Sequence, residues 1–138
     1  MRSMGVVLAL LVLACNSAPT APGNSIPAGG ATIVLQVESP KQVDTDLRVS
    51  FAQVVEDSRC PASVVCVWQG NGAIRLDVTT GGSPQSITLN TAGGTAFPGE
   101  TSAGGYTFTL VELDPQRKTP DPVPAQQYRA TIRVTRAH

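Results

Sequence analysis

Apolar and polar residues alternate along six segments of this chain, and this alternation is its strongest structural signal. Ile74, Leu76 and Val78, for example, would lie on one face of an extended strand, with polar residues between them on the other face. A period of two over about four to eight residues is typical of a half-buried β-strand. The segments are rich in Val, Ile, Thr and aromatic residues; they are residues 32–39, 45–55, 72–80, 85–91, 106–114 and 127–136.

The breaks between these segments support the same architecture. Gly81 and Gly82 separate two segments and predict a hairpin turn, whereas residues 91–105 predict a long Gly-rich loop. Residues 114–126 carry four prolines, which cannot join a central ladder, and predict an extended loop. No window of about 11 or more residues has a helical period. We therefore expect an all-β fold, an antiparallel β-sandwich or a flattened barrel of about six to seven strands.

One irregularity interrupts the alternation at the end of the second segment. Phe51 and Gln53 would share the inward face, yet the apolar pair Val54 and Val55 follows. Either a β-bulge redirects the side chains here, or the strand ends.

The first fifteen residues predict the cellular compartment. Arg2 precedes an apolar run of eight residues from Val6 to Leu13, which is too short to span a bilayer and is typical of a secretory signal. The ending Val-Leu-Ala-Cys resembles a bacterial lipobox, which implies cleavage before Cys15 and lipid on its thiol. The alternative is an ordinary signal peptide cut nearby. Acyl chains contribute about 0.8 kcal/mol per buried methylene, so a lipidated Cys15 would hold the protein stably on a membrane.

The cysteine count agrees with export. With Cys15 assigned to lipid, Cys60 and Cys66 remain as a matched pair among the three cysteines. An oxidising compartment favours their disulfide. Asn16 follows Cys15, so the aspartate associated with inner-membrane retention in some bacteria is absent, which favours the outer membrane.

Composition predicts how the chain is divided into segments, and its charge indicates which classes of partner to expect. We predict a signal peptide (residues 1–14), a lipidated cysteine with a flexible Pro/Gly/Ser/Ala tether (15–30) and a single β-domain (31–138). Loss of Arg2 with the signal leaves nine basic against ten acidic side chains, a net charge of −1. This balance gives no electrostatic support for binding DNA, RNA or acidic lipid, and we expect no nucleic-acid partner.

Residues 56–72 contain two of the three cysteines, the only tryptophan, a proline and two glycines. The spacing of the candidate catalytic and metal-binding residues argues against catalysis. A catalytic dithiol uses Cys-x-x-Cys at a helix N-terminus, whereas five residues separate Cys60 from Cys66, and both lie between strands. Structural zinc takes four Cys or His ligands and calcium takes a cluster of oxygens, but the only histidine is the terminal His138. Ser58 and Ser63 have no histidine that could serve as their base. We expect no catalytic residue, no metal and no cofactor.

A disulfide-pinned corner fits the motif best. A Cys60–Cys66 bond closes a seven-residue ring, for which the chain-entropy model gives roughly 2–2.5 kcal/mol. Trp68 is either a core residue, which we expect, or a partly exposed anchor, and Val64, Val65 and Val67 could pack against the core. Gly70 and Gly72 would frame a tight turn before the next strand. Asp57 can cap the turn through backbone amides, and Arg59 can pair with Asp57 or lie over Trp68. Asp57 and Arg59 are either this local scaffold or a binding site.

The motif from Phe51 to Gly70, which contains Asp-Ser-Arg-Cys-Pro-x-x-Val-x-Cys-Val-Trp-x-Gly, resembles one found in small exported bacterial β-domains, often lipoproteins. A closing strand from Tyr128 to Val134 also fits, and the resemblance covers most of residues 31–136. Members commonly have a small residue where Gln69 stands here. The resemblance implies the fold and the location, and it implies no activity or catalytic residue.

These observations predict a membrane-anchored, non-enzymatic lipoprotein domain of the cell envelope that acts as a binding module. Its partner would be an unknown protein or small molecule, recognised by loops on a disulfide-pinned scaffold. The alternatives are a structural or stress-protective envelope protein, and an enzyme that uses carboxylates or a labile disulfide.

Overall fold

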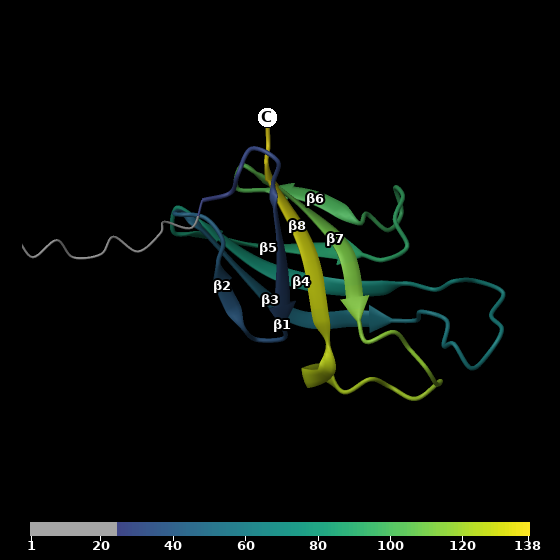
Figure 1. The fold of residues 1–138 in the computed structure, drawn as a ribbon. Helices are drawn as coiled ribbons and strands as arrows, with labels where there is room; N and C mark the ends of the chain where they lie inside the picture. Colours follow the sequence, from purple (N-terminus) through teal and green to yellow (C-terminus); the bar gives the residue numbers. More distant parts are fainter. Residues whose placement is uncertain (1–24) are drawn as a thin grey trace, which may run out of the picture.

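The computed structural model describes residues 25–138 and consists of two four-stranded sheets packed face to face (Figure 1). One sheet has the strand order β1-β8-β7-β6 and the other the order β2-β3-β4-β5, and neighbouring strands in both are antiparallel. The strands of one sheet cross those of the other steeply in Figure 1. The elements are β1 (Ala31–Gln36), β2 (Pro40–Gln42), β3 (Leu47–Asp57), β4 (Gly72–Thr80), β5 (Ser83–Asn90), β6 (Glu100–Ala103), β7 (Tyr106–Asp114), the 3₁₀ turn η1 (Ala125–Gln127) and β8 (Arg129–Arg136). The predicted β-sandwich is confirmed, and the sheets do not close into a barrel.

The alternation in the sequence becomes the core between the two sheets. Phe51 on β3 and Phe108 on β7 are the largest fully buried side chains, one from each sheet. The other large side chains with almost no exposure are Leu35, Leu47, Val49, Ile74, Leu76, Val78, Leu89, Leu113, Ile132 and Val134. Among the described residues 25–138, the buried members of the core lie between residues 26 and 134. A chain of residues 16–138 therefore contains all of this core.

The irregularity predicted in β3 is present. The register of β3 against β4 shifts between Phe51 and Gln53, and again between Val54 and Glu56. Pairing continues to Asp57, so the strand does not end at the break. The shifts leave Val54 half-buried and Val55 more than half exposed, as a β-bulge that redirects side chains would.

The hairpin between β4 and β5 is also confirmed, whereas two short strands escaped prediction. Gly81 and Gly82 form the hairpin turn with positive φ angles of 54° and 84°. The unpredicted strands are β2, with three residues, and β6, with four. Strands this short carry no readable alternation, and β6 lies inside the segment 91–105 that was predicted to be a loop.

The packed domain begins earlier than the predicted boundary at residue 31. Ile26 is only 6% exposed and belongs to the core. The Gly30 N–H donates to the Pro27 carbonyl over 2.9 Å, and the Arg133 guanidinium donates to the Gly29 carbonyl. The last residues of the predicted tether are thus part of the domain, because Ile26 supplies a large apolar side chain. Cys15 and the predicted signal lie outside the described residues.

The two ends of β3 lie in different surroundings. At its start, the turn around Asp44 meets the end of β8 through Arg136, close to where the described chain enters the sandwich. At its finish, β3 continues into residues 58–71, which project from the sandwich on the right of Figure 1. Eleven residues at about 3.3 Å each place these ends roughly 35 Å apart.

Candidate functional site

The projection at residues 58–71, here called the disulfide loop, contains the predicted disulfide. Cys60 and Cys66 are bonded, with an S–S distance of 2.10 Å and Cα atoms 5.9 Å apart. The pairing of β3 with β4 extends into the loop, because the Ser58 N–H donates to the Asn71 carbonyl and the Cys60 N–H to the Gln69 carbonyl. The seven-residue ring therefore stands on a short two-stranded base.

Gly70 is required by the backbone of this base. Its φ is +70°, in the left-handed region that side chains disfavour. A Cβ at this position would lie 1.8 Å from the Ser58 carbonyl oxygen on the facing strand. Any other residue would force the two strands of the base apart, so Gly70 shapes the corner as predicted.

Asp57 and Arg59 form a nearly buried ion pair beneath the loop. The Arg59 Nε lies 2.7 Å from Asp57 Oδ1 and its second guanidinium nitrogen 2.8 Å from Asp57 Oδ2, with the side chains 11% and 8% exposed. The Tyr128 hydroxyl also donates to Asp57 Oδ2, over 2.7 Å. Arg59 further donates to the carbonyls of Leu113 and Pro115. We call Asp57, Arg59 and Tyr128 the base cluster; it joins the ends of β3 and β7 to the start of β8.

The base cluster stabilises the ionised forms of Asp57 and Arg59. Burial raises the pKa of Asp57, but the hydrogen bonds from Arg59 and Tyr128 and the Arg59 charge outweigh it, so this pKa lies below its ordinary value. The hydrogen bond to Asp57 is the main reason why the pKa of Arg59 is raised. Burial, followed by the bond to Asp57, raises the pKa of Tyr128 to about 12. All three side chains are engaged with one another, as a scaffold requires, so the local reading of Asp57 and Arg59 fits the structure better than a free binding site.

The Pro-rich segment between β7 and η1 supports the disulfide loop from one side. The N–H groups of Ala62 and Ser63 donate to the carbonyls of Arg117 and Lys118, over 2.9 and 3.1 Å. In return, the Arg117 guanidinium donates to the carbonyls of Asp57 and Arg59. The two loops therefore form one unit at this end of the sandwich, although 50 or more residues separate them in the chain.

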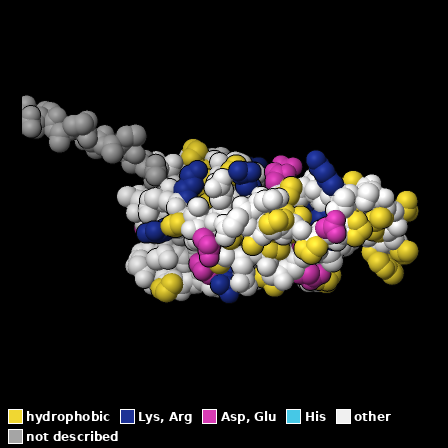
Figure 2. Space-filling model, turned by 90° about the horizontal axis from the view of Figure 1, so that it is seen from below, with side chains coloured by type: hydrophobic (Ala, Val, Ile, Leu, Met, Phe, Trp, Pro, Cys, Tyr) yellow, Lys and Arg dark blue, Asp and Glu magenta, His cyan; other side chains and the backbone are white. Residues whose placement is uncertain are grey.

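The expectation that Trp68 fills the core is wrong, because its side chain is 81% exposed. Val65 and Val67 are almost fully exposed and Val64 is 43% exposed, so these valines do not pack on the core either. The residue of the ring that faces inward is Pro61, which is buried. We call Val64, Val65, Val67 and Trp68 the apolar tip. It lies at the right-hand end of the molecule, where apolar side chains gather in Figure 2.

The physical reason for this exposure lies in what surrounds the ring. The buried core residue Leu113 already lies at the base of the loop, where its carbonyl accepts from Arg59, and the Pro-rich segment occupies one side. The turn that begins at Pro61, closed by the Val64 N–H on the Pro61 carbonyl, then directs residues 64–68 outward. No charged side chain occurs from Cys60 to Ile74, so the projecting segment is uncharged as well as apolar.

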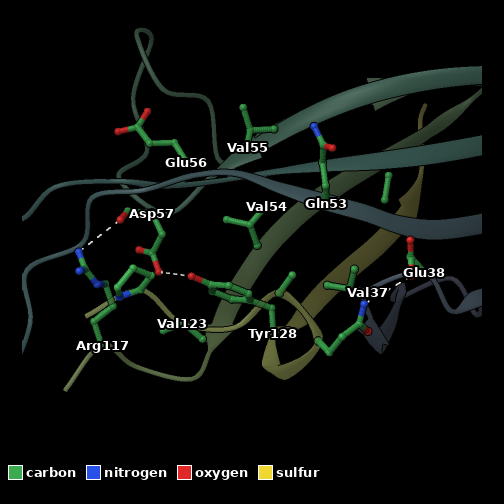
Figure 3. A pocket seen from close by; sticks show the side chains of 14 residues that line it. Val37, Glu38, Gln53, Val54, Val55, Glu56, Asp57, Arg117, Val123 and Tyr128 are labelled. Carbon is green, nitrogen blue, oxygen red and sulfur yellow. Dashed lines mark hydrogen bonds between the residues drawn. The ribbon is translucent and has the colours of Figure 1, made fainter. Parts of the chain in front are cut away.

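A shallow hollow of about 500 Å³ lies beside the loop, between the second half of β3 and the Pro-rich segment (Figure 3). Tyr128 and Val54 lie within it, while Glu38 and Arg117 lie toward opposite ends in Figure 3. Two of its polar side chains already have partners: the Gln126 amide donates to Glu38 over 3.5 Å, and Arg117 donates to backbone carbonyls. The hollow is lined by both polar and apolar side chains and is open to solvent.

The chemistry available in the described residues is limited. Within residues 25–138 no three His, Cys, Asp or Glu side chains gather where a metal ion could bind. The Ser58 hydroxyl donates to Glu56 over 2.7 Å and accepts the Asn71 N–H, so it serves the turn. His138 is exposed at the end of the chain. None of the helical structure in residues 25–138 is long and apolar enough to cross a bilayer.

Two contributors to this region could not be identified from the sequence. Tyr128 was expected only as an inward-facing strand residue, and its bond to Asp57 spans 71 positions. Arg117 lies in a segment predicted to be loop, and its contacts with residues 57 and 59 span about 60 positions. A pattern within one segment carries no signal for such distant pairs.

Comparison of the chain with family models, with curated proteins and with solved structures gives no match. The site is therefore described from its own geometry alone.

Proposed function

We propose that this protein is a non-enzymatic binding module of the bacterial cell envelope, anchored to a membrane through lipid on Cys15. Its contact element is the apolar tip. The observation that carries the proposal is the exposure of four apolar side chains, Trp68 among them, on a ring fixed by a disulfide. Large apolar side chains held in water at one place mark an interaction site.

The construction of the loop supports recognition over catalysis. The Cys60–Cys66 bond, the base cluster and the Pro-rich segment all limit the movement of the ring. A loop ordered before binding loses less conformational entropy when it binds. The titratable side chains beneath it, Asp57 and Arg59, are used to hold it in place.

The placement of the loop also suits an anchored module. The described chain enters the sandwich near Gly29 and Arg133, at the end opposite the disulfide loop. Lipid on Cys15 would attach the protein near that end and leave the tip free for contact. Mass spectrometry of the protein from its host tests the anchor: acylated Cys15 is expected, and an unmodified or removed Cys15 would contradict it.

Photo-crosslinking in the host tests the binding role. A photoreactive amino acid replaces Val65 in one variant and Gln85, an exposed residue of β5 far from the tip, in the control. We expect crosslinked adducts, whether to protein or to lipid, from position 65 and few from position 85. Equal or absent adducts at both positions would contradict the proposal and favour the structural or stress-protective alternative.

A further inference from the structure

We propose that the occupant of the apolar tip is a lipid bilayer: Val65, Val67 and Trp68 insert shallowly at the boundary between headgroups and acyl chains. This inference deepens the proposed function and rests on the tip being its contact element. It gives the module a membrane contact that is separate from Cys15.

The chemistry of the tip suits this boundary. Val65 and Val67 expose nearly all of their apolar surface, and Trp68 offers an apolar ring with one N–H donor. Tryptophan is enriched at the level of the lipid headgroups because its ring is amphipathic. The uncharged stretch from Cys60 to Ile74 means that no ionised group would have to enter the bilayer with these side chains.

Part of the ring's backbone is already hydrogen-bonded within the protein. Unpaired backbone groups are costly in a bilayer, because no water is present to satisfy them. In the ring, the N–H groups of Cys60, Ala62, Ser63 and Val64 already have carbonyl partners within the protein. These four donors can stay bonded on insertion, whereas the N–H groups of Val65 and Val67 have no protein partner among the described residues, so insertion stops at the hydrated level of the headgroups.

The size of the tip argues against a stable contact with a second copy of this chain or with a flat protein surface. A standard interface buries about 800 Å² per partner and involves roughly 20–30 residues on each side. The tip offers four side chains on a narrow projection. A fluid bilayer requires no matching surface, so a small convex tip is sufficient there.

The charges around the tip indicate an apolar contact rather than an electrostatic one. Lys118 is exposed beside Ser63, and Glu112 is exposed on the other side, near Cys60 and Gln69. Arg59 and Arg117 are bound to groups within the protein. Because positive and negative charges flank the loop together, anionic lipid should add little to the binding.

The dimensions allow the tip and lipid on Cys15 to reach the same bilayer. Ten residues, Asn16–Ser25, lie between Cys15 and the buried Ile26, and ten residues can span at most about 35 Å. The two ends of β3 are separated by a similar roughly 35 Å. With both contacts made, the sandwich would lie along the membrane surface.

Trp68 makes the test direct, because it is the only tryptophan in the chain. Oxidised protein of residues 16–138 is mixed with vesicles of phosphatidylcholine, with and without phosphatidylglycerol, and Trp68 emission and cosedimentation are recorded. We expect a blue shift and cosedimentation with both vesicles. Salt at about 1 M, where the Debye length is about 3 Å, should change the partition coefficient less than about twofold.

Matched variants locate the contact. Val65→Asp places a charge at the most exposed position of the tip, while Val34→Asp makes the same change at an exposed position of β1. We expect Val65→Asp to lower the partition coefficient at least about tenfold and Val34→Asp to leave it unchanged, with thermal unfolding confirming that both variants fold.

Three results would overturn the inference. The first is no vesicle binding by the wild-type protein, and the second is equal binding by Val65→Asp. The third is a Trp68 shift that depends on protein concentration without lipid, which would assign the tip to a second copy of the chain. If lipid binding fails while position 65 still yields crosslinks to a protein in the host, the proposed function stands and only its lipid partner is wrong.

Discussion

Two clusters of the same chemistry lie at opposite ends of β3. At its finish, Asp57 accepts a tyrosine hydroxyl from Tyr128 and pairs with Arg59. Just before its start, Asp44 accepts the hydroxyl of Tyr106 over 3.0 Å and pairs with Arg136 over 2.6 Å. The residues involved are almost interchangeable between the two ends, so residue types alone do not reveal which end is functional.

The difference lies in what each cluster supports. The cluster at Asp44 closes a short turn, in which the Val43 N–H and the Leu47 carbonyl are bonded directly to each other. The base cluster instead carries the disulfide loop, whose apolar tip is exposed. The aspartate clusters at both ends thus organise the backbone. The candidate function belongs to the uncharged side chains of the apolar tip, which are present only at the end with the base cluster.

The largest loss of unfolding free energy should come from removing the aspartate of a cluster, Asp57 in one variant and Asp44 in the other. Asp57→Ala leaves Arg59 buried and unpaired, and breaking such a pair costs about 3–5 kcal/mol. Asp44→Ala should cost less, about 1–3 kcal/mol, because Arg136 is 58% exposed and Tyr106 keeps its bond to Asp46. Urea unfolding of both variants measures the difference. Equal losses would mean that the two clusters do the same structural work.

The disulfide should have the next largest effect. Replacing Cys60 and Cys66 together by Ser removes the restraint of a seven-residue ring, which is worth roughly 2–2.5 kcal/mol in the chain-entropy model. Urea unfolding of the variant, compared with wild-type protein with and without reductant, checks this value. If reduction leaves the unfolding free energy unchanged, the ring is held by its hydrogen bonds alone.

Acid should lower the unfolding free energy by protonating the aspartates at the two ends of β3. The folded pKa of Asp57 is depressed, so its stabilisation is complete above about pH 5 and is lost as the pH falls through the folded pKa. For Asp44, burial raises the pKa, but hydrogen bonds from Thr45 and Tyr106 and the Arg136 charge lower it overall, which gives the same sign. Urea unfolding between about pH 7 and pH 3 should show a smaller acid loss for Asp57→Asn than for the wild type. An identical loss would remove Asp57 from the acid transition.

High pH should lower the unfolding free energy by deprotonating Tyr128 of the base cluster. A tyrosine titrates near pH 10 when unfolded, whereas the pKa of Tyr128 is raised to about 12 by burial and by Asp57. The stabilisation from the folded Tyr128 is therefore present below about pH 10 and is lost as the pH rises through about 12. Unfolding at increasing pH, with Tyr128→Phe as the control, should show a shallower alkaline loss in the variant.

The smallest effect on stability is expected at Trp68. Because its side chain is 81% exposed, Trp68→Ala should change the unfolding free energy by no more than about 0.5 kcal/mol. A tryptophan packed in the core would cost about 3–5 kcal/mol. A loss of that size in urea unfolding would restore the interpretation of Trp68 as a core residue.

How far the sequence could predict this molecule depends on the distance between the interacting residues. Alternation within each strand identified the sandwich, and the matched pair of cysteines identified the disulfide. The break after Phe51 located the irregularity in β3, although the sequence left a bulge and a strand end equally open. The pairing of Asp57 with Arg59, two positions apart, was one of the two arrangements expected for Arg59. These features depend on residues close together in the sequence, so they can be predicted from it.

The orientation of the loop could not be predicted for a physical reason. Apolar residues such as Trp68 and Val65 are usually buried, and whether they are depends on what already fills the space behind them. Here the Pro-rich segment occupies one side of the ring through Ala62 and Ser63. That contact joins segments more than 50 positions apart, so the sequence pattern around Trp68 carries no trace of it.

We infer that the base cluster stabilises the loop end of the domain and that the tip makes the binding contact. The most direct test is the crosslinking yield from position 65 in the host, measured in the Trp68→Ala background and normalised to the amount of protein. We predict a clear fall in yield, with the amount and stability of the protein unchanged. An unchanged yield, or a fall that only follows a loss of protein, would contradict the account.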